Sequence, residues 1–100
     1  MDFDRLKHSL SVARKMVEIG KSYNLTDNEL QELFLLGFNH DIGYEFSNNG
    51  INHNVIGGNI LKESGYKFWQ EVYNHGNPDV NYSSLYLKLL FTILINISFN

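Results

Sequence analysis

Residues 33–43 read Leu-Phe-Leu-Leu-Gly-Phe-Asn-His-Asp-Ile-Gly, an apolar run that ends in a polar pair and a glycine. The apolar side chains recur at helical spacing, and residues 26–29 have the form of a capping box, so we predict a helix over residues 26–38. The glycine after the polar pair favours an exit from the helical path. We therefore expect His40 and Asp41 at the carboxyl end of a largely buried helix.

The apolar residues on both sides of this segment predict further helices. We expect them over residues 4–23, 51–64 and 66–74, with a fifth element starting near residue 83. Gly57 and Gly58, inside the third of these five helices, indicate a close backbone approach to a neighbouring element, and Gly65 is expected to end that helix. Residues 91–100 alternate with a strand-like period of two, but the fifth element begins as a helix and we assign it to that class.

Short connections between the predicted helices favour a compact bundle. The sequence therefore predicts an all-α fold of about five helices. A chain of 100 residues has room for one domain, so we expect a single domain over residues 1–100.

Composition excludes several classes of function. With a net charge of −3 and only eight lysines and arginines, the chain has no basic stripe for duplex nucleic acid, although a single nucleotide remains a candidate ligand. The chain has no cysteine, so it can form neither a disulfide nor a thiolate metal site, and a transition metal must be held by imidazole and carboxylate. The absence of disulfides fits a cytoplasmic protein. The first residues lack the apolar run of a signal peptide and polar residues interrupt the apolar stretch 85–99, so we expect neither export nor a membrane span.

Each of the four histidines lies in or beside a different predicted helix. His8 lies in the first, His40 ends the second, His53 begins the third and His75 ends the fourth. Helical bundles build metal sites from side chains that converge from facing helices, and Asp41 adds an oxygen ligand next to His40. The same residues also suit helix capping and the negative ends of helix dipoles, so their pattern alone leaves both interpretations open.

The ordered set of motifs resembles the HD superfamily of metal-dependent phosphohydrolases. The motifs, which extend over the chain from Arg5 to Leu90, are Arg5-Leu-Lys-His8, His40-Asp41-Ile-Gly, His53 followed by Gly57-Gly58, and Tyr73-Asn-His75-Gly. The resemblance implies an HD-like helical domain and a site that binds one or two divalent metal ions.

The resemblance also implies a role for each matching residue. His8, His40 and Asp41 would bind a metal ion, and Asp41 would be the catalytic carboxylate that bridges two ions in a dinuclear site. His53 and His75 would hold a second ion or contact the substrate phosphate. Imidazole and carboxylate ligands suit Mn²⁺, Fe²⁺, Zn²⁺, Co²⁺ or Ni²⁺ better than Mg²⁺ or Ca²⁺.

One part of the family pattern is missing. HD proteins have an aspartate on the final helix that completes the metal coordination, and the matching position here falls near Ile93 or Leu94, neither of which can bind a metal. The last acidic residue of the chain is Asp79, before that helix. The alternatives are an altered carboxyl-terminal segment, a degenerate site, or a ligand supplied by water or by Asp79.

From these observations we expect a metal-dependent phosphohydrolase whose small substrate is a phosphomonoester, a nucleotide or a phosphodiester, with a metal-activated water as the attacking group. Arg5 matches an arginine that some nucleotide-hydrolysing HD proteins place near the phosphate, so the resemblance implies that Arg5 binds the substrate phosphate. One alternative is a catalytically impaired HD-like domain that binds nucleotide or metal as a regulatory module, and another is a structural helical domain whose histidines cap helices. The apolar carboxyl-terminal segment is a candidate surface for a homodimer.

Overall fold

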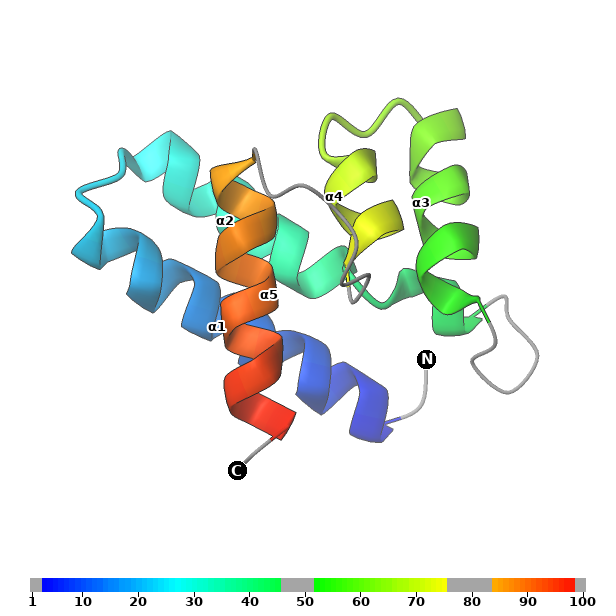
Figure 1. The fold of residues 1–100 in the computed structure, drawn as a ribbon, viewed down its shortest axis with the longest axis horizontal. Coiled ribbons are helices and arrows are strands. Elements are labelled where there is room, and N and C mark those ends of the chain that lie inside the picture. The colour runs from blue at the N-terminus through cyan, green and yellow to red at the C-terminus, as the bar shows by residue number, and fades with distance from the viewer. Residues whose placement is uncertain (1–2, 46–51, 76–83, 99–100) are drawn as a thin grey trace.

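The computed structural model describes residues 3–45, 52–75 and 84–98 of the chain. Its elements in chain order are α1 (Phe3–Ser22), α2 (Asp27–Asn39), the 3-10 helix η1 (Ile42–Glu45), α3 (His53–Glu63), α4 (Trp69–Asn74) and α5 (Leu85–Ser98). The part of the chain that the structure describes contains no strand, so the predicted all-α fold is confirmed (Figure 1).

The helices α1 and α2 run in opposite directions and pack closely (Figure 1). Gly37 permits this contact, because a Cβ atom there would lie 2.7 Å from the Cα atom of Ala13. The predicted capping box starts α2: the Glu29 amide donates to Thr26 Oγ1 at 3.2 Å, and the Thr26 amide donates to Glu29 Oε1 at 3.0 Å. The antiparallel packing of α1 and α2 places the carboxyl end of α2, where His40 lies, against the first half of α1.

The helices α3 and α4 form a second pair, and η1 packs against α3. Gly58 faces α4, where a Cβ atom would lie 2.7 Å from the Cα atom of Tyr73, and Gly57 faces the backbone amide of Gly43 in η1, 2.8 Å from where its Cβ would lie. The predicted close approach of this glycine pair is thus confirmed. Gly65 follows the end of α3 with a φ of +82°, a conformation that favours glycine.

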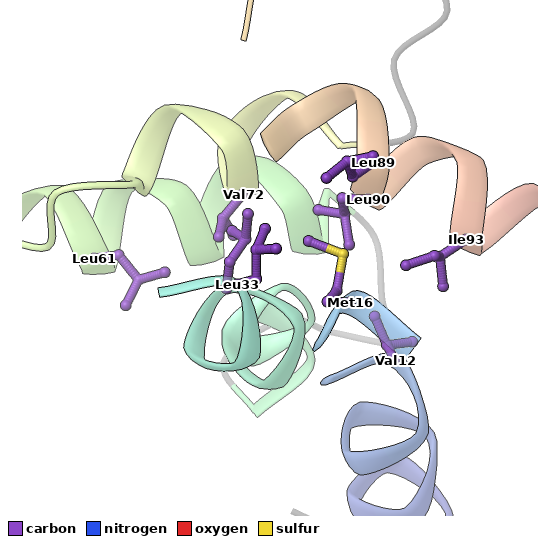
Figure 2. Packing of buried hydrophobic residues seen from close by; sticks show 9 residues of the cluster. Val12, Met16, Leu33, Leu61, Val72, Leu89, Leu90 and Ile93 are labelled. Atoms are coloured by element: carbon purple, nitrogen blue, oxygen red, sulfur yellow. The ribbon is translucent and has the colours of Figure 1, made fainter. Parts of the chain in front are cut away.

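The hydrophobic core lies between α1, α2 and α5 and extends to α3 and α4. Figure 2 shows how side chains of α5 point toward α1 and α2. The buried members of this core are Val12, Met16, Leu33, Leu36, Leu61, Val72, Leu89, Leu90 and Ile93.

The described part of α5 is helical, as predicted, although its sequence alternates from Phe91 onward. The buried residues Leu89, Leu90 and Ile93 recur at helical spacing, and a lone strand would leave its backbone groups without partners. None of the described helices is long and apolar enough to cross a bilayer. Leu85 and Ile95 are exposed on α5, and the homodimer stays a prediction.

Most of the helices begin later than predicted, and local contacts explain this for α4 and α5. α4 begins at Trp69 because the chain first makes a turn, in which the Tyr66 amide donates to the Leu61 carbonyl at 2.9 Å. α5 begins after Ser84, whose Oγ accepts a hydrogen bond from the Leu87 amide at 3.3 Å, an N-cap contact. The predicted loop at residues 47–50 and the candidate ligand Asp79 lie outside the described residues.

Candidate metal centre

Side chains from four parts of the chain meet near the carboxyl end of α2. They are the six that the sequence analysis selected: Arg5 and His8 on α1, His40 and Asp41 at the end of α2, His53 at the start of α3, and His75 at the end of α4. The structure brings all six together around the carboxylate of Asp41.

The backbone positions these side chains at points where helices start or stop. His40 is the C-cap of α2 and keeps a helical conformation, with φ −59° and ψ −29°, so Asp41 follows almost as a continuation of the helix. η1 then turns the chain, and Gly43 has no Cβ, which would collide with the carbonyl group of His53. The tight contact between η1 and the start of α3 therefore brings His53 next to Asp41.

Each oxygen of the Asp41 carboxylate faces a pair of histidines. Oδ2 lies 3.2 Å from Nε2 of His8 and 3.2 Å from Nε2 of His40, and these two nitrogens are 3.3 Å apart. Oδ1 lies 3.4 Å from Nε2 of His53 and 3.3 Å from Nε2 of His75, which are 3.2 Å apart. We call these groups the His8–His40 half and the His53–His75 half.

The buried histidine of each half is held by a backbone carbonyl three residues earlier. Nδ1 of His40 lies 2.6 Å from the Gly37 carbonyl oxygen, and Nδ1 of His75 lies 2.5 Å from that of Val72. A carbonyl oxygen only accepts, so each Nδ1 carries the hydrogen that it donates. In the neutral ring Nε2 then bears a lone pair, and in both residues it faces the carboxylate.

When His40 and His75 are neutral, their contacts with the carboxylate place acceptor against acceptor. A lone pair of His40 Nε2 faces both Oδ2 of Asp41 and a second imidazole nitrogen, and the His53–His75 half repeats the arrangement. Such groups repel one another unless a proton or a metal ion lies between them. Two overlapping sets of three ligand atoms fit a metal, His8 with His40 and Asp41, and Asp41 with His53 and His75.

The electrostatics of the centre favour a metal ion over an added proton. Burial lowers the pKa of His40, although hydrogen bonding and the charge of Asp41 oppose this shift. Burial alone would raise the pKa of the Asp41 carboxyl, but the four imidazoles, which hydrogen-bond to the carboxylate whenever their Nε2 carries a proton, outweigh burial and hold that pKa far below its ordinary value. Asp41 is therefore an anion, and His40 prefers the neutral form that binds metals.

The two halves are about equally buried, and each combines one buried histidine with one partly exposed histidine. The side chains of His40, His75 and Asp41 are 1%, 4% and 6% exposed, whereas those of His8 and His53 are 28% and 25% exposed.

Arg5 lies on α1, three residues before His8. Its Nη1 is 3.5 Å from Oδ2 of Asp41, and its side chain is 39% exposed. The guanidinium group thus contacts one oxygen of the central carboxylate, and the side chain as a whole is partly exposed.

The family model of the HD domain matches residues 5–90 of the chain. The chain belongs to the HD-domain family. The predicted resemblance is thereby confirmed, and HD domains bind divalent metals, which agrees with the donor atoms gathered here. No curated protein and no solved structure matches this HD domain.

The sequence analysis missed the carbonyl groups that orient the ligands. Gly37 and Val72 each lie three residues before a histidine at a helix end, and this spacing was the available signal. Asn54, next to His53, also donates to the Tyr73 carbonyl at 3.1 Å and links α3 to α4 beside the centre. These contacts orient His40 and His75 and hold α3 against α4, without themselves supplying a candidate metal ligand.

The carboxylate that HD proteins place on their final helix has no counterpart on α5. This helix contains no acidic residue, and Ile93, at the expected position, is buried in the hydrophobic core. Leu94 packs partly buried against the same core. The described part of this HD domain thus offers the metal four imidazoles and one carboxylate.

Proposed function

We propose that this HD-domain protein is a metal-dependent hydrolase of a small phosphate ester, either a phosphomonoester, a nucleotide or a phosphodiester. The observation that supports this most is the central carboxylate of Asp41, which has a pair of imidazole nitrogens within 3.4 Å on each of its two oxygens. Imidazoles around a shared carboxylate suit transition metals such as Mn²⁺, Fe²⁺, Co²⁺, Ni²⁺ and Zn²⁺.

A divalent ion bound there would supply a Lewis acid that polarises a phosphoryl oxygen and lowers the pKa of a water. The protein itself supplies preorganisation. His40 and His75 are fixed by the carbonyls of Gly37 and Val72, so their lone pairs remain aimed at the centre without an entropic cost at binding.

Arg5 is the residue that we propose for binding the substrate phosphate. It lies beside the central carboxylate with a partly exposed side chain, and a planar guanidinium can donate two parallel hydrogen bonds to phosphoryl oxygens. The partly exposed histidines His8 and His53 are further groups that could donate hydrogen bonds to the phosphate of a substrate.

The test is turnover by metal-free protein reloaded separately with Mn²⁺, Co²⁺, Ni²⁺ and Zn²⁺. The substrates are p-nitrophenyl phosphate, bis(p-nitrophenyl) phosphate and a panel of nucleotides. We expect metal-dependent hydrolysis that Asp41→Asn lowers by about 100- to 1000-fold, since loss of the metal removes several kcal/mol of transition-state stabilisation. Asn59→Ala, an exposed substitution on α3, is the control. Protein that binds metal but hydrolyses none of these substrates contradicts the proposal.

The second candidate is a regulatory module that binds nucleotide or metal without turnover. This candidate is favoured by the composition of α5, which supplies apolar side chains to the core and no carboxylate to the metal centre. Loss of one charged ligand weakens a metal site. Equilibrium binding of a nucleotide to metal-loaded protein, with no product after prolonged incubation, supports this candidate over the first.

A further inference from the structure

We infer that the two halves of the centre are unequal, and that a first divalent ion binds in the His53–His75 half rather than the His8–His40 half. This inference rests on the proposed metal dependence. It concerns the order in which the chain binds ions, which is separate from the question of which substrate it hydrolyses.

The ligand atoms do not distinguish the two halves. Each half has two Nε2 atoms and one oxygen of Asp41, and all the distances between these atoms lie between 3.2 and 3.4 Å. Each has one buried histidine fixed by a carbonyl and one histidine that is about a quarter exposed. Neither donor chemistry nor exclusion of water therefore favours one half.

The difference between the halves is a fixed positive charge. Nη1 of Arg5 is 3.5 Å from Oδ2 of Asp41, the oxygen that belongs to the His8–His40 half. A guanidinium carries a permanent positive charge, so an ion in this half would share Asp41, its one anionic ligand among the described residues, with a second cation. Among the described residues, Arg5 is the only arginine or lysine that forms a salt bridge with Asp41, and this salt bridge is to Oδ2.

No carboxylate offsets this charge from α5. The helix contains no acidic residue, and its residues next to α1 are apolar core side chains such as Ile93. In the HD pattern an aspartate at this point would add a negative ligand to the His8–His40 half. Without it, that half combines one shared carboxylate oxygen with a neighbouring guanidinium, and its affinity for a cation falls.

The matched experiment compares His8→Ala with His53→Ala, two substitutions of about equally exposed ligands. Metal-free protein is titrated with Co²⁺, and the visible absorption of the bound ion and a competing chelator report the number of sites and their affinities. We expect wild-type protein to bind one ion about 10- to 100-fold more tightly than a second, the range by which a neighbouring group tunes metal affinity. His53→Ala should remove the tight site, and His8→Ala should retain it.

Arg5 supplies the second arm of the experiment. Arg5→Met should tighten the weak site and reduce the difference between the two sites, whereas Arg5→Lys, which keeps the charge, should preserve most of it. Circular dichroism checks that each variant is folded. The inference is wrong if His8→Ala removes the tight site, if the wild-type sites are equal, or if Arg5→Met leaves the difference unchanged.

The outcomes separate this inference from the proposed function. Ions bound in the opposite order, with hydrolysis present, overturn only the inference. Ions bound in the expected order, without hydrolysis of any substrate, overturn only the proposed function. Wild-type protein that binds no Co²⁺ at all overturns both.

Discussion

Gly58→Ala should destabilise the protein and loosen the His53–His75 half of the centre. The Cβ atom of an alanine at this position would lie 2.7 Å from Cα and 2.9 Å from N of Tyr73, both backbone atoms of α4. Ordinary contacts begin near 3.4 Å, so α3 and α4 must separate by several tenths of an ångström. The strain cannot be relieved by rotating a side chain.

Two opposing effects set the magnitude. Alanine favours a helix over glycine by about 1 kcal/mol, and overpacking against a rigid neighbour costs about 2–3 kcal/mol at its upper end. The net loss is therefore about 1–2 kcal/mol of unfolding free energy, which lowers Tm by about 5–15 °C in a domain of this size. Because His53 begins α3 and His75 ends α4, the same separation lengthens the 3.2 Å contact between their Nε2 atoms.

The assay is urea and thermal unfolding of metal-free protein, followed by Co²⁺ titration. Asn59→Ala is the control, because it changes the next residue of α3 at an exposed position. A Gly58→Ala protein as stable as this control would refute the argument from backbone contact. Unchanged affinity for Co²⁺ in a destabilised Gly58→Ala protein would refute the link between helix separation and the centre.

Three further predictions concern the metal, pH and the core. Co²⁺ at about 100 times its Kd should stabilise the fold by about 2.7 kcal/mol and raise Tm by about 10–20 °C, an effect that a chelator reverses and Asp41→Asn abolishes; a shift that survives Asp41→Asn would place the ion elsewhere. Metal-free protein should lose stability as the pH falls below about 6.5, because burial lowers the pKa of His40 in the folded state and the unfolded chain then binds more protons. His40→Gln should reduce the difference in urea stability between pH 7 and pH 5, and an unchanged difference would exclude His40 as its source. Leu90→Ala should cost about 2–5 kcal/mol in urea unfolding because Leu90 is fully buried, and a loss below 1 kcal/mol would mean that the core collapses around the cavity.

The helices could be predicted from the sequence because their signals are local. The capping contacts of Thr26 and the stop at Gly65 depend only on neighbouring residues, and both occur as expected. The strand-like alternation after Phe91 did not determine the structure of this segment, because the burial of its apolar side chains favours a helix. Side chains such as Leu90 and Ile93 keep helical spacing into the core, and the helix satisfies its own backbone groups.

The members of the centre could be predicted, but not their arrangement. Sequence order identified the four histidines and Asp41, because each lies at or near a helix end or on the first helix. Which pair of histidines lies against which oxygen of Asp41 depends on close contacts between helices. The glycines in the sequence indicate that such contacts exist, but not which helices make them. The position of Arg5 on Oδ2 rather than Oδ1 depends on the orientation of α1, which no local pattern encodes.

The carboxylate of Asp41 closes several chain loops at one point. It contacts Arg5 across 36 positions of sequence, while His8 meets His40 across 32 and His53 meets His75 across 22. An ion bound at this centre would be a reversible cross-link between four segments of the chain. It would disfavour expanded conformations of the chain. Docking of the helices already closes these loops in the folded protein, so binding of an ion there carries no further loop-closure cost. The unfolded chain would have to close them on binding, and we therefore expect it to bind the ion more weakly than the folded protein does.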